Sequence, residues 1–194
     1  GRDVYDVMNE HAEKIPAGSY GMLCCFSDVM NYIHWTHSSP TFTNFELDPE
    51  KFNKYTFYRA ILENTALLVR GHIDLVREAT GNEPDELMFA GGASKSPLWS
   101  QIVADVTGKT VKVPVVKEAT ALGAAIIAGT GVGIYPSVSE GAKQVVKFER
   151  TFEPNPENTA VYEELYKTWR EVYKAQFALS EAGVTKSMWR APGL

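Results

Sequence analysis

Apolar residues recur at helical spacing in four stretches of the chain. The longest runs from Lys54 to about Thr80, keeps a 3.6-residue period and contains no proline. A second long pattern extends from 161 to 177, and shorter ones cover 3–15 and 138–146. These periodicities predict two long helices and two short ones.

Between residues 85 and 130 the pattern changes type several times. The run ELMFAGG predicts a strand, 97–106 a helix, TVKVPVV a second strand and EATALGAAIIAGTG a second helix. Consecutive strand–helix units favour parallel strands, a right-handed crossover and helices that cover the sheet. We therefore expect an α/β fold.

The remaining extended segments are short. GMLCCF predicts a strand in which neighbouring side chains point to opposite faces, so Cys24 and Cys25 are expected to be buried, unbonded thiols in a reducing compartment. The alternation at Phe45 and Leu47 and the pattern at 147–152 also favour strands. EPNPEN has the composition of a linker.

Composition and charge exclude several classes of partner. The 194 residues carry a net charge of −5 and scattered basic residues, so no nucleic-acid surface is expected. The N-terminus resembles neither a signal nor a transit peptide, and no apolar run is long enough to span a bilayer. We expect one domain of a cytoplasmic protein with no membrane partner.

The stretch FAGGASKSPLW carries the candidate chemistry. Gly91, Gly92 and Ala93 leave a strand end without bulky side chains, so that a ribose or phosphate can approach the main chain. Ser96 and Pro97 fit the N-cap and first position of a helix. The same residues also suit an ordinary tight turn, and neither the P-loop motif nor the dinucleotide fingerprint is present.

The whole run from 89 to 131, FAGGASKSPLWSQIVADVTGKTVKVPVVKEATALGAAIIAGTG, resembles the adenosine-binding region of the FGGY carbohydrate kinases. YRAILENTALLV at 58–69 is similar to a helix of that family that carries an arginine-alanine pair followed by a glutamate. The resemblance implies a ribonuclease H-like (actin-like ATPase) domain, with 1–194 as the C-terminal lobe of a two-lobed sugar kinase. The N-terminal lobe of the same kinase would then be a partner of this domain.

By the same resemblance, Gly91, Gly92 and Ala93 would contact the nucleotide through their backbone, and Ser96 would lie near the adenine. ATP and Mg²⁺ are the implied cofactors. The phosphate loop and the catalytic base would lie upstream, so no catalytic or metal-binding residue is assigned, and we expect this chain alone to be inactive. The aspartates at 28, 74, 85 and 105 are expected to be solvated or capping groups.

The resemblance also implies a small sugar-like substrate. The segment 26–47 departs from the usual family pattern, and with the ending KSMWRAPGL it resembles the branch that phosphorylates autoinducer-2, 4,5-dihydroxy-2,3-pentanedione, on its primary hydroxyl. A xylulose, ribulose or gluconate kinase lobe is the alternative within the family. A non-catalytic nucleotide- or sugar-sensing module is the alternative of another class.

Other features have more ordinary interpretations. His34 and His37 have metal-ligand spacing but no third ligand, so lining the cleft or surface exposure is favoured. Residues 123–125 would let their helix pack closely on the sheet, and Glu118 would cap or orient its start. An aromatic stripe at helical spacing predicts core or lobe interface, with a homodimer face as an open alternative: Tyr162, Tyr166, Trp169 and Tyr173.

Overall fold

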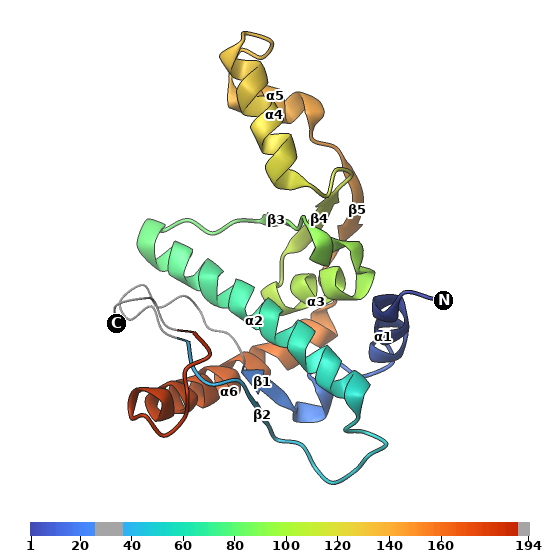
Figure 1. Ribbon diagram of the computed structural model, residues 1–194, viewed down its shortest axis with the longest axis vertical. Coiled ribbons are helices and arrows are strands. Elements are labelled where there is room, and N and C mark those ends of the chain that lie inside the picture. The colour runs from blue at the N-terminus through green and yellow to red at the C-terminus, as the bar shows by residue number, and fades with distance from the viewer. Residues whose placement is uncertain (26–36, 190–194) are drawn as a thin grey trace.

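The computed structural model describes residues 1–25 and 37–189, which form a mixed α/β fold (Figure 1). Its helices are α1 (Val4–Ala12), η1 (Ser19–Gly21), α2 (Lys54–Thr80), η2 (Gly92–Lys95), α3 (Pro97–Thr107), α4 (Ala119–Gly131), α5 (Val138–Val145) and α6 (Pro156–Glu181). Its strands are β1 (Leu23–Cys25), β2 (Thr41–Thr43), β3 (Glu86–Met88), β4 (Thr110–Pro114) and β5 (Phe148–Phe152). None of the helices described has an apolar stretch long enough to cross a bilayer.

The larger sheet has the order β3-β4-β5. The predicted parallel pairing of β3 and β4 is confirmed, with Leu87 opposite Val111, whereas β5 is antiparallel to β4. Helix α3 packs against β4 and β5, and both Val111 and Val113 are fully buried. The α/β class expected from the sequence is therefore correct.

β1 pairs antiparallel with β2 in a separate two-stranded sheet. The strand predicted around Phe45 and Leu47 is wrong, because the strand lies earlier, at Thr41–Thr43. Asn44 adopts a left-handed conformation (φ 63°), which ends the extended run and turns the chain outward. As a result Leu47 is completely exposed.

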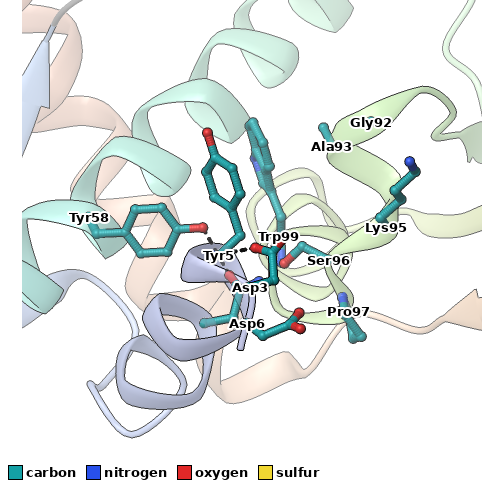
Figure 2. A pocket seen from close by; sticks show the side chains of 11 residues that line it. Asp3, Tyr5, Asp6, Tyr58, Gly92, Ala93, Lys95, Ser96, Pro97 and Trp99 are labelled. Atoms are coloured by element: carbon teal, nitrogen blue, oxygen red, sulfur yellow. Dashed lines mark hydrogen bonds between the residues drawn. The ribbon is translucent and has the colours of Figure 1, made fainter. Parts of the chain in front are cut away.

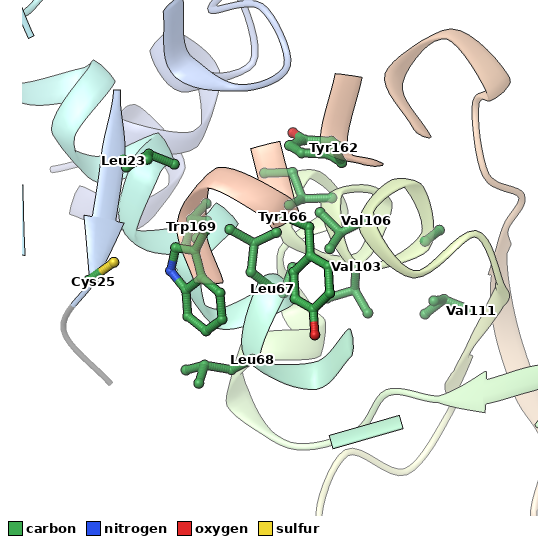
Figure 3. Close-up of a cluster of buried hydrophobic side chains, with 14 residues drawn as sticks. Leu23, Cys25, Leu67, Leu68, Val103, Val106, Val111, Tyr162, Tyr166 and Trp169 are labelled. Atoms are coloured by element: carbon green, nitrogen blue, oxygen red, sulfur yellow. The ribbon is translucent and has the colours of Figure 1, made fainter. Parts of the chain in front are cut away.

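The main core lies where α2, α3, α6 and β1 meet (Figure 3). Trp169 is fully buried there, and its indole N–H donates to the carbonyl of Cys24 and to Asn64 Oδ1, at 3.1 Å each. The aromatic stripe of α6 thus contributes to the core, which was one of the roles predicted for it from the sequence. Cys25 packs in this core and Cys24 in a smaller cluster with Met22, so the two buried thiols point apart and form no disulfide with each other.

A buried ion pair ties α2 to η1 and α6. Arg59 and Glu63 lie one turn apart, with Nε and Oε1 separated by 2.9 Å. The Glu63 carboxylate also accepts hydrogen bonds from the Gly18 N–H, the Ser19 hydroxyl and the Tyr162 hydroxyl. Burial, followed by the Glu63 charge, raises the pKa of the Tyr162 phenol. The arginine and glutamate of YRAILENTALLV therefore hold η1 against α2 and α6.

The supposed linker EPNPEN is instead the start of α6. Asn155 caps the helix and Pro156 occupies its first turn, where a missing N–H costs nothing. Asp105 is buried, and it accepts hydrogen bonds from the Asn155 N–H and from Asn158 Nδ2, each at 2.8 Å. The expectation that Asp105 is a solvated or capping group is therefore wrong: it is a buried acceptor that holds the capping residue Asn155.

The expected packing of α4 on the sheet is wrong. α4 pairs with α5, and the two project beyond the sheet, away from α2 and α6 (Figure 1). No atom of the described residues lies within 4 Å of a Cβ built on Gly123. The close contact lies at Gly129 and Gly141, which approach the Tyr135 ring. Because α4 is apolar on all sides, its sequence did not indicate which face would be covered.

Candidate functional site

A cavity of about 540 Å³ lies where α1, α2 and the turn before α3 meet (Figure 2). This volume is within the range of about 300–1,000 Å³ usual for small-molecule sites. The lining residues are Asp3, Tyr5, Asp6, Asn9, Tyr58, Gly92, Ala93, Lys95, Ser96, Pro97 and Trp99. The cavity therefore joins the glycine turn to two segments that are distant from it in sequence.

The two glycines of the turn have different roles. Gly91 has φ 84° and ψ −170°, a conformation open essentially to glycine alone, and its N–H donates to the Lys117 carbonyl. Gly92 does not have a positive φ, and a Cβ added there would meet no atom of the described residues within 4 Å. Gly91 is thus required by the turn, whereas Gly92 leaves open space beside the cavity.

Ser96 and Trp99 show why an S-x-x-W sequence begins α3. The Ser96 hydroxyl accepts a hydrogen bond from the Trp99 N–H at 3.2 Å, as expected of an N-cap, and Pro97 follows in the first turn. The Trp99 indole N–H donates to Thr65 Oγ1 of α2 at 2.8 Å. The serine starts the helix and the tryptophan anchors it, which fixes one side of the cavity.

Helix α1 forms the opposite side of the cavity. Asp3 caps this helix by accepting a hydrogen bond from the Tyr5 N–H at 2.7 Å. The Tyr58 hydroxyl donates to Asn9 Oδ1 at 3.0 Å, which joins α2 to α1. Burial, and then the neighbouring Tyr5, raises the pKa of Tyr58, so its hydroxyl remains a donor near neutral pH.

Charges in the cavity are unevenly distributed. Asp3 and Asp6 contribute two carboxylates on the α1 side, and Lys95 contributes one ammonium group at the end of η2. Carboxylates repel phosphates but accept hydrogen bonds from hydroxyl and amino groups. The α1 side suits the uncharged, hydroxyl-bearing part of a ligand better than its phosphates.

The structure brings Gly92, Ala93 and Ser96 together in the cavity lining, whereas Gly91 shapes the turn from one position earlier. Sequence reasoning missed the residues of α1 and α2, namely Asp3, Tyr5, Asp6, Asn9 and Tyr58. No local signal marks them, because only the packing of α1 on α2 and of α2 on α3 brings them to the turn.

Two other sequence expectations concern charged or metal-binding groups. His34 lies outside the described residues, whereas His37 is partly buried beside Trp189, with ring centroids 5.6 Å apart. Glu118 precedes α4 but makes no side-chain capping bond to the described residues, so its predicted capping role is wrong. It is an exposed residue whose carbonyl accepts from the Leu122 N–H.

The residues present do not form a ready Mg²⁺ site. Across 1–25 and 37–189, no group of three or more histidine, cysteine, aspartate or glutamate side chains is arranged to hold a metal ion. Mg²⁺ is commonly bound through one or two carboxylates together with substrate phosphates. No residue of this chain is therefore assigned to the metal.

The family model described as FGGY family of carbohydrate kinases, C-terminal domain, matches residues 3–132. The chain therefore belongs to the FGGY family of carbohydrate kinases. The matched region includes α1, α2, the glycine turn and α3, which are the segments around the cavity.

Within this family, the chain is similar along its whole length to autoinducer-2 kinases. The autoinducer-2 kinase of Salmonella choleraesuis is 50% identical to this chain over 194 residues, which are all of the chain and 37% of that protein. The chain thus spans little more than a third of the length of this relative.

Solved structures of sugar kinases share the fold. The ligand-bound xylulose kinase of Lactobacillus acidophilus superposes with a TM-score of 0.77 at 18% identity, over 94% of this chain and 36% of that one. The glycerol kinase of Plasmodium falciparum, solved with ADP, superposes with a TM-score of 0.70 at 19% identity, over 88% of this chain and 34% of that one. Similarity at this level of identity establishes the fold alone.

Proposed function

We propose that this chain is the nucleotide-binding C-terminal lobe of an ATP-dependent carbohydrate kinase. The observation that carries the proposal is the cavity in which Gly92, Ala93 and Ser96 face α1. Gly92 supports it most directly, because the fold gives no conformational or packing reason for a glycine there. An approaching ligand does give such a reason.

Within the cavity, the adenosine end of ATP would lie between the glycine turn and α1. Gly91, Gly92 and Ala93 would present their backbone to the nucleotide, and Ser96 would lie near the adenine. The Asp3 and Asp6 carboxylates suit ribose hydroxyls better than phosphates. The phosphates would therefore point away from these two carboxylates, and Mg²⁺ would accompany the phosphates.

The proposed acceptor is autoinducer-2, phosphorylated on its primary hydroxyl. The 50% identity to an autoinducer-2 kinase along the whole chain supports this substrate over xylulose, ribulose or gluconate. Phosphoryl transfer also needs a group that orients the acceptor hydroxyl. We place that group, the phosphate loop and most sugar contacts in an N-terminal lobe of the full-length protein, and we expect this chain alone to be inactive.

The proposed lobe comprises all of residues 1–194, and the proposed kinase is cytoplasmic. The exposed apolar surface of α4 supports an arrangement in which another part of the protein packs on it. Ile127 is 62% exposed in the described structure, although a helix that is apolar on all sides is normally buried.

The test is a substrate profile of the full-length protein with ATP and Mg²⁺. Autoinducer-2 is assayed beside xylulose, ribulose, gluconate and glycerol, and kcat/KM is compared. A clear preference for autoinducer-2 is expected. Preference for a pentulose or gluconate would support the alternative within the family, and no turnover of any of them would favour a nucleotide- or sugar-sensing module.

A further inference from the structure

The glycine turn beside the cavity is held at both ends by residues that are distant from it in sequence. At its start, the Gly91 N–H donates to the carbonyl of Lys117, which follows β4, at 3.0 Å. At its end, Arg150 Nη2 of β5 donates to the Ser94 carbonyl at 2.7 Å. Both bonds are tertiary contacts, so the main chain of the turn is fixed by partners that it does not itself supply.

One carboxylate joins these two partners. Glu149 Oε1 lies 2.6 Å from Lys117 Nζ and 3.2 Å from Arg150 Nε. Within the turn, the Ser94 hydroxyl donates to the Gly91 carbonyl at 2.8 Å, and Ser94 is fully buried. The contacts therefore close a ring that runs from the turn through three charged residues and back. We call Lys117, Glu149 and Arg150 the charged clamp.

The two residues that the ring encloses are the ones that face the cavity. Gly92 and Ala93 lie between Gly91 and Ser94 and line the cavity, whereas the members of the charged clamp lie outside the lining. A glycine-containing turn is conformationally free unless other contacts restrain it. Restraint before binding lowers the entropy that a ligand must remove, and so strengthens its affinity.

We propose that the charged clamp positions the main chain of residues 92–93 for the nucleotide. The proposal rests on the proposed kinase function and deepens it, because it names residues that set nucleotide affinity from outside the cavity. Arg150 is the main positioning residue, since it acts through the Ser94 carbonyl, and Glu149 orients its guanidinium group. Both charged residues of β5 lie beyond 3–132, the part of the chain that the family model matches.

The chemistry of arginine suits this position. Arg150 uses two different nitrogens, Nε toward Glu149 and Nη2 toward Ser94, and the planar guanidinium group fixes the angle between them. A lysine has a single nitrogen at the end of a flexible stem, so it keeps the charge without fixing both contacts. An arginine-to-lysine change therefore separates the charge from the geometry.

The experiment uses the full-length kinase and two variants of Arg150. Arg150→Met keeps an unbranched stem but removes every donor, and Arg150→Lys keeps the charge. Lys143→Met, which removes a positive charge at an exposed position of α5, is the matched control. For each protein, the dissociation constant of ATP, KM for ATP, KM for autoinducer-2, kcat and amide exchange at residues 92–93 are measured.

Arg150→Met is expected to weaken ATP binding about tenfold, the size of one lost hydrogen bond from a charged donor. Arg150→Lys should weaken it to a smaller extent, and amide exchange at 92–93 should become faster in both. KM for autoinducer-2 should not change, and Lys143→Met should behave like wild type. A merely structural role would lower kcat through the folded fraction and leave both KM values unchanged.

Three results would overturn the clamp proposal alone: an unchanged affinity for ATP in Arg150→Met, an equal rise in both KM values, or the same loss of ATP affinity in Lys143→Met. The last result would show that the effect comes from net charge rather than from the position of the turn. A wild-type protein that binds no ATP would instead refute the proposed function, and with it any role of the charged clamp in nucleotide binding.

Discussion

At the scale of single residues, the two adjacent glycines of the turn separate folding from binding. Gly91→Ala should lower the free energy of unfolding by about 1–3 kcal/mol, because alanine must adopt a conformation that favours glycine. Gly92→Ala should change it by less than about 0.5 kcal/mol, because the new methyl group meets open space. Urea denaturation of both variants measures the difference, and equal destabilisation would contradict these roles.

The buried Cys24 thiol gives a prediction that depends on pH. Burial, and then the neighbouring Cys25, raises its pKa from 9.0 to about 12. Above pH 9 the thiol therefore ionises in the unfolded chain before it does so in the folded one, and folding stability falls as pH rises from 9 towards 12. Below pH 9 this effect is absent.

Cys24→Ala should remove this part of the pH dependence. The measurement is the stability of wild type and variant from about pH 8 to about pH 11, where their difference isolates the thiol from the tyrosines that also ionise. Parallel curves for the two proteins would show that Cys24 is not the group responsible.

At the scale of elements, the Arg59–Glu63 pair joins α2 to η1 and α6. Glu63→Gln keeps the shape of the side chain but leaves Arg59 as a buried, unpaired charge, which should cost about 3–5 kcal/mol. Glu164→Gln, which breaks an exposed pair with Lys167, should leave stability nearly unchanged. Denaturation midpoints compare the two, and similar losses would show that the buried pair has no special role.

Elements with a strong period and clear end signals could be predicted from the sequence. α2 begins and ends at the expected residues, because its apolar face is long and Gly81 closes it in a left-handed conformation. The start of α6 was missed, because its asparagine cap and Pro156 also have the composition of a linker. The β2 strand was misplaced, since nothing local to Asn44 showed that it would turn the chain.

At the scale of the whole molecule, α4 is the surface that most needs a neighbour. In the full-length protein we expect it to be covered, so a cysteine introduced by Ile127→Cys should react slowly with a maleimide. Glu164→Cys, on the exposed side of α6, should react rapidly. Rapid labelling at both positions would contradict the proposed packing of another part of the protein on α4.

The candidate site could be predicted only in part, because some of its residues form a short motif whereas others are brought to it by packing between distant segments. Gly92, Ala93 and Ser96 form a contiguous motif, and the sequence indicated all three. Tyr5 and Tyr58 reach the cavity only through the packing of α1 on α2, which depends on contacts between distant segments. Residue periodicity carries no information about such contacts, so the α1 side of the cavity required the structure.

We propose that the adenosine end of ATP occupies the cavity beside Gly92. The most direct test is the dissociation constant of ATP for full-length Gly92→Trp, with Glu164→Trp as a control that adds the same ring outside the cavity. We predict that Gly92→Trp weakens ATP binding at least about tenfold, since the indole fills the space left by glycine, with no change in the control. Unchanged affinity in Gly92→Trp would contradict the placement of the nucleotide in this cavity.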